Sequence, residues 1–124
     1  MFMPIVWMFA AATAAAAAAP SPGHLDKQGR YFLFREPVEM YWNDWTGMPL
    51  NRGTAGQIDV HILGEGKSQE FDGVVSLNCT TGSGFFWKEA SVWGKSASES
   101  DIAGAVPLVV ISNARNLFCP TDAH

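Results

Sequence analysis

The sequence "GEGKS" at residues 64–68 ends in the Gly-Lys-Ser of a phosphate-binding loop. In such a loop the glycines let backbone N–H groups converge on a phosphate, and a helix follows directly. The first glycine of the pattern would stand at position 61, which is occupied by His61. Residues 69–79 alternate between apolar and polar side chains, which predicts a strand where the loop would need a helix. We therefore interpret residues 64–68 as a hairpin turn and expect no nucleotide ligand.

His61 is the best candidate for acid–base chemistry. Asp59 precedes it on the same face of a strand, and Glu70 or Asp72 would lie across the hairpin. A histidine beside a carboxylate is the starting material of general acid–base catalysis. A hydrolase would further need an activated nucleophile, and no serine of the sequence stands in a Gly-x-Ser-x-Gly elbow. We expect no catalytic residues and keep, as the alternative, a small hydrolase that uses His61 with Asp59 or Glu70.

Aromatic and polar side chains gather in one short stretch, "YWNDW". Aromatic rings beside amides and carboxylates suit a glycan-binding surface or anchor a protein partner. The surrounding residues 38–56 are rich in Gly, Asn, Asp and Pro, which predicts an irregular exposed loop after a possible short strand. The alternative is that this loop folds inward and buries its rings. We predict a binding site of five consecutive residues, Tyr41, Trp42, Asn43, Asp44 and Trp45.

Alternating or aromatic-rich segments predict the strands that position these residues. They are residues 30–35, 57–63, 69–79 and 85–93. The second and third of these segments read as an antiparallel hairpin, because both alternate and only a Gly-rich link separates them. Residues 94–100 read as a polar surface loop.

Residues 107–118 fit an amphipathic helix, with Pro107 in its first turn and Pro120 after its end. The β-branched run at residues 109–111 would also suit a strand. We predict an α+β fold, in which a small antiparallel meander of about four or five strands is packed by this C-terminal helix. The alternative is an all-β sandwich or barrel.

Residues 1–19, "MFMPIVWMFAAATAAAAAA", carry no charged side chain, and Pro20 follows directly. Small residues at the end of an apolar run are typical of an export signal, whereas a spanning helix prefers ~20 strongly apolar residues. We expect residues 1–19 to be a cleaved signal peptide, with an uncleaved membrane anchor of an envelope component as the alternative. Residues 20–29 are then a flexible lead-in, and residues 30–124 form a single globular domain.

Cys79 and Cys119 are an even pair in a chain expected in an oxidising compartment, which predicts a disulfide between them. These two cysteines and the three histidines have no zinc-site spacing, so we expect no metal or cofactor. The net charge of −4, with interspersed charges, argues against nucleic acid as a partner, and a membrane is a partner only if residues 1–19 remain. We therefore predict a small periplasmic or secreted, non-catalytic binding domain for a protein or glycan of the cell envelope.

Overall fold

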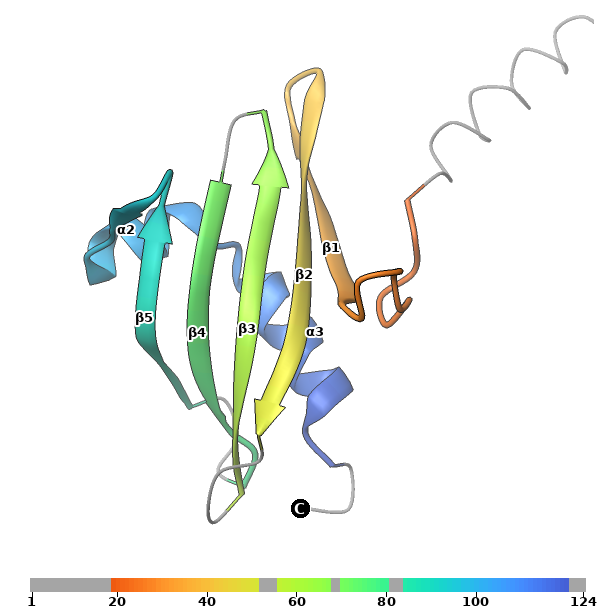
Figure 1. Cartoon of the computed structure of the whole chain (residues 1–124), viewed down its shortest axis with the longest axis vertical. Helices are drawn as coiled ribbons and strands as arrows, with labels where there is room; N and C mark the ends of the chain where they lie inside the picture. The colour runs from red at the N-terminus through yellow and green to blue at the C-terminus, as the bar shows by residue number, and fades with distance from the viewer. Residues whose placement is uncertain (1–18, 52–55, 68–69, 81–83, 121–124) are drawn as a thin grey trace, which may run out of the picture.

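The computed structural model describes residues 19–51, 56–67, 70–80 and 84–120. They form a six-stranded antiparallel sheet in which every strand pairs with the next one along the chain. Two helices lie against one face of this sheet and leave the other face open (Figure 1). The α+β fold, with a meander sheet and a C-terminal helix, is therefore confirmed.

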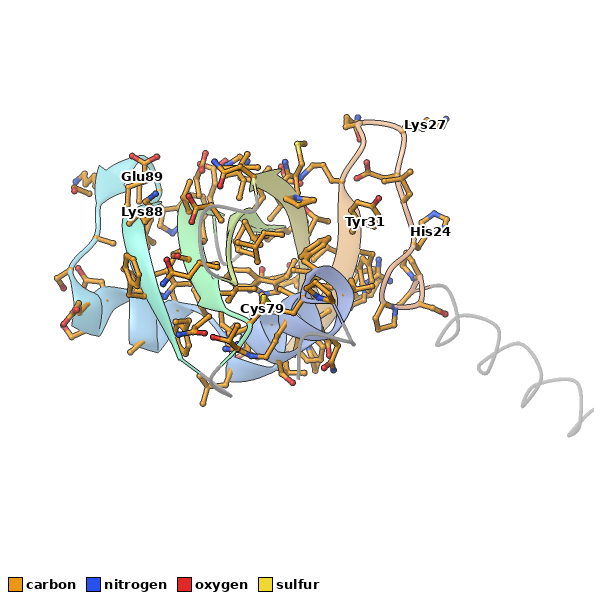
Figure 2. All side chains as sticks on the ribbon, turned by 90° about the horizontal axis from the view of Figure 1, so that it is seen from below. His24, Lys27, Tyr31, Cys79, Lys88 and Glu89 are labelled. Atoms are coloured by element: carbon orange, nitrogen blue, oxygen red, sulfur yellow. A yellow bond between two sulfur atoms is a disulfide. The ribbon has the colours of Figure 1, made fainter. Side chains whose placement is uncertain are left out.

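The strands are β1 (Tyr31–Val38), β2 (Tyr41–Asn51), β3 (Gln57–Gly66), β4 (Glu70–Asn78), β5 (Phe85–Val92) and β6 (Lys95–Ser96), and the helices are α2 (Glu99–Ala105) and α3 (Leu108–Phe118). Figure 2 views the molecule along the strands and shows the helices as a second layer beneath the sheet, with Cys79 next to that layer.

Strand β2 corrects the sequence interpretation of residues 38–56. The segment Tyr41–Asn51 is a strand and not an irregular loop, although it contains Gly47 and Pro49. Gly47 favours close packing, since a Cβ atom there would lie 3.1 Å from the side chain of Leu33, tighter than an ordinary contact. Pro49 stands next to a register shift in the β2–β3 pairing, where a missing N–H is tolerated. Both residues therefore act as strand residues here, although their types are typical of turns.

The predicted hairpin of residues 57–79 is confirmed as the antiparallel pair β3 and β4. Apolar and polar residues alternate along both strands as expected, and the apolar ones on the inward face are buried under the helices. These buried residues are Ile58, Val60, Ile62, Phe71, Val75 and Leu77. Each contributes about 1.5–3 kcal/mol when its side chain is removed from water, so this hairpin is the centre of the core.

The glycines of "GEGKS" make room for β2. A Cβ atom on Gly64 would lie 2.6 Å from the ring of Trp45, and a Cβ atom on Gly66 would overlap the side chain of Asn43. Both glycines belong to strand β3, and strand β4 follows. Residues 68–69 of the link lie outside the described residues. Close packing between two strands therefore explains the glycines that resemble a phosphate-binding pattern.

The helix predicted at residues 107–118 is confirmed as α3, which buries Val110, Ile111, Ala114 and Phe118. Its β-branched residues are tolerated because burial against the sheet outweighs their weaker helix propensity. The side-chain amide of Asn113 donates a hydrogen bond of 2.7 Å to the carbonyl of Leu33 in β1. Helix α3 is thereby held to the edge of the sheet.

Helix α2 and strand β6 replace much of the polar loop expected at residues 94–100. Ser98 caps the helix, because its hydroxyl accepts from the backbone N–H of Asp101 while the Asp101 carboxylate accepts from the backbone N–H of Ser98. This reciprocal arrangement is a capping box. Its Ser-x-x-Asp pattern is visible in the sequence and could have located the helix.

The predicted disulfide between Cys79 and Cys119 is confirmed, with a Cα–Cα distance of 5.4 Å. Cys79 follows the last residue of β4, and Cys119 caps the end of α3. The bond therefore joins the end of a central strand to the C-terminal end of the helix that covers the sheet.

The predicted signal peptide falls almost entirely on residues 1–18, which lie outside the described residues. The segment expected as a lead-in folds back along β1. The backbone N–H of Gly23 donates to the carbonyl of Phe32 at 2.8 Å, and the N–H of Phe32 donates to the carbonyl of His24 at 2.7 Å. None of the helices in the described ranges is long and apolar enough to cross a membrane.

Candidate functional site

The five residues of the predicted binding site lie at the start of β2, where the strand separates them into two groups. Tyr41 and Trp42 are 44% and 52% exposed, whereas Asn43 and Trp45 are 3% and 0% exposed. Asp44 is intermediate. Only part of the predicted site therefore faces solvent.

The two buried residues share one carboxylate. The indole N–H of Trp45 donates to Glu36 Oε1 at 3.1 Å, and the amide of Asn43 donates to the same oxygen at 3.2 Å. The ring of Trp45 also packs on Phe71, with 5.6 Å between the ring centroids. Asn43 and Trp45 thus hold the β1–β2 hairpin to the core, and the inward burial considered for this segment applies to these two residues.

The exposed residues line a hollow of about 460 Å³ at the end of the sheet. It lies where the β1–β2 hairpin stands beside the end of β3 and the start of β4 (Figure 1). We call this hollow the rim pocket. It is lined by Met40, Tyr41, Trp42, Asp44, Glu65, Gly66, Lys67 and Glu70.

Cations of the chain stand over both aromatic rings of the rim pocket. The guanidinium carbon of Arg35 lies 4.5 Å from the ring centroid of Trp42, and the ammonium of Lys67 lies 4.7 Å from that of Tyr41. These distances are typical of cation–π contacts. One face of each of these rings therefore already holds a positive charge.

Arg35 also forms a two-pronged ion pair with Asp44. Its Nε donates to Oδ1 at 2.7 Å and its Nη2 donates to Oδ2 at 2.8 Å. This hydrogen bonding raises the pKa of Arg35 and outweighs the opposing effect of burial, while the negative charge of Asp44 adds a lesser increase. The planar pair fixes the guanidinium above Trp42 and compensates the charge of Asp44.

Glu65 and Glu70 face each other directly across the β3–β4 pair. Like charges in this position are unfavourable. Both residues are exposed, and neither forms an ion pair with another residue in the described ranges. The lining of the rim pocket therefore includes two exposed carboxylates that form no ion pair with the described residues.

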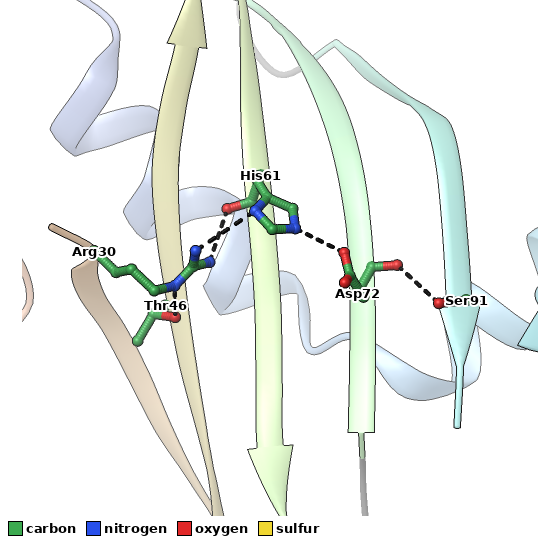
Figure 3. A network of polar contacts seen from close by, with 5 residues as sticks. All are labelled: Arg30, Thr46, His61, Asp72 and Ser91. Atoms are coloured by element: carbon green, nitrogen blue, oxygen red, sulfur yellow. Dashed lines mark hydrogen bonds and ion pairs between the residues drawn. The ribbon is translucent and has the colours of Figure 1, made fainter. Parts of the chain in front are cut away.

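His61 belongs to a separate polar network on the open face of the sheet (Figure 3). Its Nε2 lies 2.7 Å from Asp72 Oδ1, and Nη1 of Arg30 lies 3.5 Å from its Nδ1. Asp59 instead pairs with Lys88 at 2.9 Å. The carboxylate beside His61 is therefore that of Asp72, one of the two residues expected across the hairpin, and not that of Asp59 or Glu70.

The network around His61 holds the strands together and lacks the parts of a nucleophilic site. Burial lowers the pKa of Arg30, while Asp26, Glu65 and Asp72 oppose that shift. The Arg30 guanidinium donates to the hydroxyl of Thr46 at 2.9 Å and to the carbonyl of His61 at 3.4 Å. The hydroxyl of Ser91 donates to the backbone carbonyl of Asp72, away from the imidazole (Figure 3).

Two further observations bear on catalysis. Both cysteines are joined in the disulfide and so offer no thiolate. Within the described parts of the chain, no three His, Cys, Asp or Glu side chains are grouped so that they could hold a metal ion.

A second hollow, of about 350 Å³, lies between β5 and the two helices. Its apolar lining includes Phe86, which is 54% exposed, and Leu108, which is 74% exposed. This groove could not be predicted from the sequence expectation of a polar loop at residues 94–100, because it requires α2 to stand beside β5. The run of three aromatic residues at the start of β5 was a usable signal, since a strand turns successive side chains to opposite faces.

Comparison with known proteins adds no relative to this picture: no protein-family model, curated protein or solved structure matches the chain. Function is therefore inferred from the geometry and chemistry of the described residues.

Proposed function

We propose that the protein is a non-catalytic binding module of the periplasm or the cell exterior, which takes a protein or glycan of the cell envelope at the rim pocket. The observation that carries this proposal is the pair of exposed rings, Tyr41 and Trp42, beside three carboxylates in one hollow. Large exposed aromatic side chains lose little entropy on binding and are common anchors of recognition surfaces.

The compartment is proposed on separate grounds. Disulfides persist in oxidising compartments and are rare in the cytosol. The Cys79–Cys119 bond joins the sheet layer to the helix layer, so it is a structural disulfide of the folded domain. This supports the export that the apolar residues 1–19 predict.

Capture of ligands from a cell-envelope extract tests the proposal. The full chain and its Tyr41→Ala/Trp42→Ala variant would each be immobilised, and the retained proteins and glycans compared. Trp93→Ala is a matched control, because Trp93 is 53% exposed but does not line the rim pocket. We expect at least one ligand to be retained by the wild type and by Trp93→Ala, and to be lost by the double variant. The same retained set on all three proteins would contradict the proposal.

A further inference from the structure

The charges of the rim pocket are unbalanced. Of its three lining carboxylates, Asp44 is compensated by the two-pronged pair with Arg35. Glu65 and Glu70 remain. The pocket lining supplies the ammonium of Lys67 against them, and Arg30, outside the lining, interacts electrostatically with Glu65. The whole chain has a formal net charge of −4, which adds a weaker long-range attraction for cations and repels anions. The pocket therefore favours a positively charged ligand.

The pairing of Glu65 with Glu70 strengthens this preference. The two residues are direct cross-strand partners, so their carboxylates repel each other across the sheet. A cation between them would relieve the repulsion as well as gain its own attraction. A cation should therefore bind more strongly between Glu65 and Glu70 than beside two carboxylates that do not repel each other.

The aromatic rings specify the kind of cation. Rings of tyrosine and tryptophan attract ammonium and guanidinium groups, and the two rings of the pocket already carry Lys67 and Arg35. A neutral sugar would have to displace these groups before it could stack on the covered ring faces. The exposed side chain of Met40 in the pocket lining offers a flexible apolar surface for an aliphatic stem.

On these grounds, and resting on the proposed function, we infer that the ligand is a basic peptide segment of a partner protein, bound through a lysine or arginine side chain. The charged end of that side chain lies between Glu65 and Glu70, and its methylene stem lies along Met40 and Trp42. Lysine and arginine combine such a stem with such a charge.

Lys67 has a particular role in this arrangement. It is exposed, and its ammonium occupies the face of Tyr41. An incoming cation meets it as a competitor for the same ring and as a like charge. Removal of Lys67 should therefore tighten the binding of a cation, whereas a merely structural role for Lys67 would not produce a gain.

The inference is tested by titrating the full chain with acetylated tetraarginine amide and following tryptophan fluorescence. Spermine, tetraglutamate and chitotetraose serve as comparison ligands. We expect tetraarginine to bind, and we expect Glu70→Gln to weaken it about two- to fivefold and Lys67→Ala to tighten it by a similar factor. Trp42→Ala should weaken binding about tenfold, and high salt should weaken it throughout.

Two control variants separate the pocket from the general charge of the protein. Glu89→Gln and Lys95→Ala make the same changes of charge at β5 and β6, away from the pocket lining. They should leave the affinity for tetraarginine unchanged. If Glu89→Gln weakened binding as much as Glu70→Gln, the attraction would be unspecific and the inference would be overturned.

The comparison ligands distinguish the remaining outcomes. Binding of spermine without tetraarginine would show that the cation comes from a free polyamine and not from a peptide, which overturns the inference of a protein partner. Binding of chitotetraose that Trp42→Ala abolishes, without any binding of cations, would overturn the inference and leave the proposed function standing. Failure of every cation to bind also overturns the inference, while the extract experiment decides on the proposed function independently.

Discussion

Trp45 donates its indole N–H to the carboxylate of Glu36 at 3.1 Å, and the ring of Trp45 is fully buried. The pair links neighbouring strands of the sheet, because Glu36 stands on β1 and Trp45 on β2. It also explains why Trp45, which was expected in a surface site, can lie in the core: its indole N–H has a hydrogen-bond acceptor inside the protein. A buried donor that loses its acceptor costs free energy, which makes the pair testable.

Glu36→Ala should lower the free energy of unfolding by about 1.5–3 kcal/mol, because it leaves the indole N–H of Trp45 without its charged acceptor. Urea denaturation followed by circular dichroism measures this loss. Glu89→Ala removes a carboxylate from an exposed strand position and should change stability by less than about 0.5 kcal/mol. Equal effects of the two substitutions would show that the Glu36–Trp45 bond does not stabilise the fold.

Trp45→Ala should destabilise the protein much more than Trp42→Ala, although the two residues stand on one strand. Trp45→Ala empties a fully buried site and should cost about 3–5 kcal/mol of unfolding free energy. Trp42→Ala removes an exposed ring and should cost about 1 kcal/mol or less, chiefly the contact with Arg35. Both values come from the same denaturation experiment. A large loss in Trp42→Ala would mean that its ring is packed inside, and would remove the rim pocket as a binding site.

Gly64→Ala should destabilise the protein by about 1–3 kcal/mol, because the new methyl group would overlap the ring of Trp45. Gly104→Ala is the matched control. A Cβ atom on Gly104 meets nothing within 4 Å, and the residue lies inside α2. Alanine there should raise the free energy of unfolding by about 1 kcal/mol, since glycine is a poor helix former. Equal stability of Gly64→Ala and the wild type would contradict the packing explanation of the "GEGKS" glycines.

Removal of the disulfide by Cys79→Ala/Cys119→Ala should lower the free energy of unfolding by about 4 kcal/mol, from the entropy of the open loop in the unfolded chain. That is a large fraction of the ~5–15 kcal/mol by which typical domains are stable. Thermal and urea denaturation of the two proteins measure the difference. Titration of thiols in the unfolded wild-type protein without reductant should find none, and a free thiol there would contradict the bond.

The elements that the sequence predicted well are those whose pattern is local. The alternation around Ile58 and Val75 identified the hairpin, and the apolar stripe through Val110 and Ala114 identified the helix. Strand β2 was missed because Gly47 and Pro49 are typical of turns when they are read one at a time. Their strand role depends on Leu33 and on the register with β3, which are not adjacent in sequence.

Only part of the candidate site could be predicted, because its other residues are brought in by strand pairing. Tyr41 and Trp42 stood out by type, but Glu65 and Glu70 join them only because Asn43 pairs with Gly66. The partner of His61 likewise depends on the exact register of the hairpin. Alternation gives the face of a strand on which a side chain lies, but it does not give the neighbour that the side chain meets.

The rim pocket and the disulfide lie at opposite ends of the sheet. Glu70 begins β4 and Cys79 follows its last residue, so the strand of nine residues separates them by about 30 Å. An affinity tag or a solid support attached beside Cys119 would consequently stand far from the point where a ligand enters. Immobilisation through the disulfide end of the sheet should leave ligand binding undisturbed. Reduction of the disulfide should lower the stability of the protein without changing its ligand specificity.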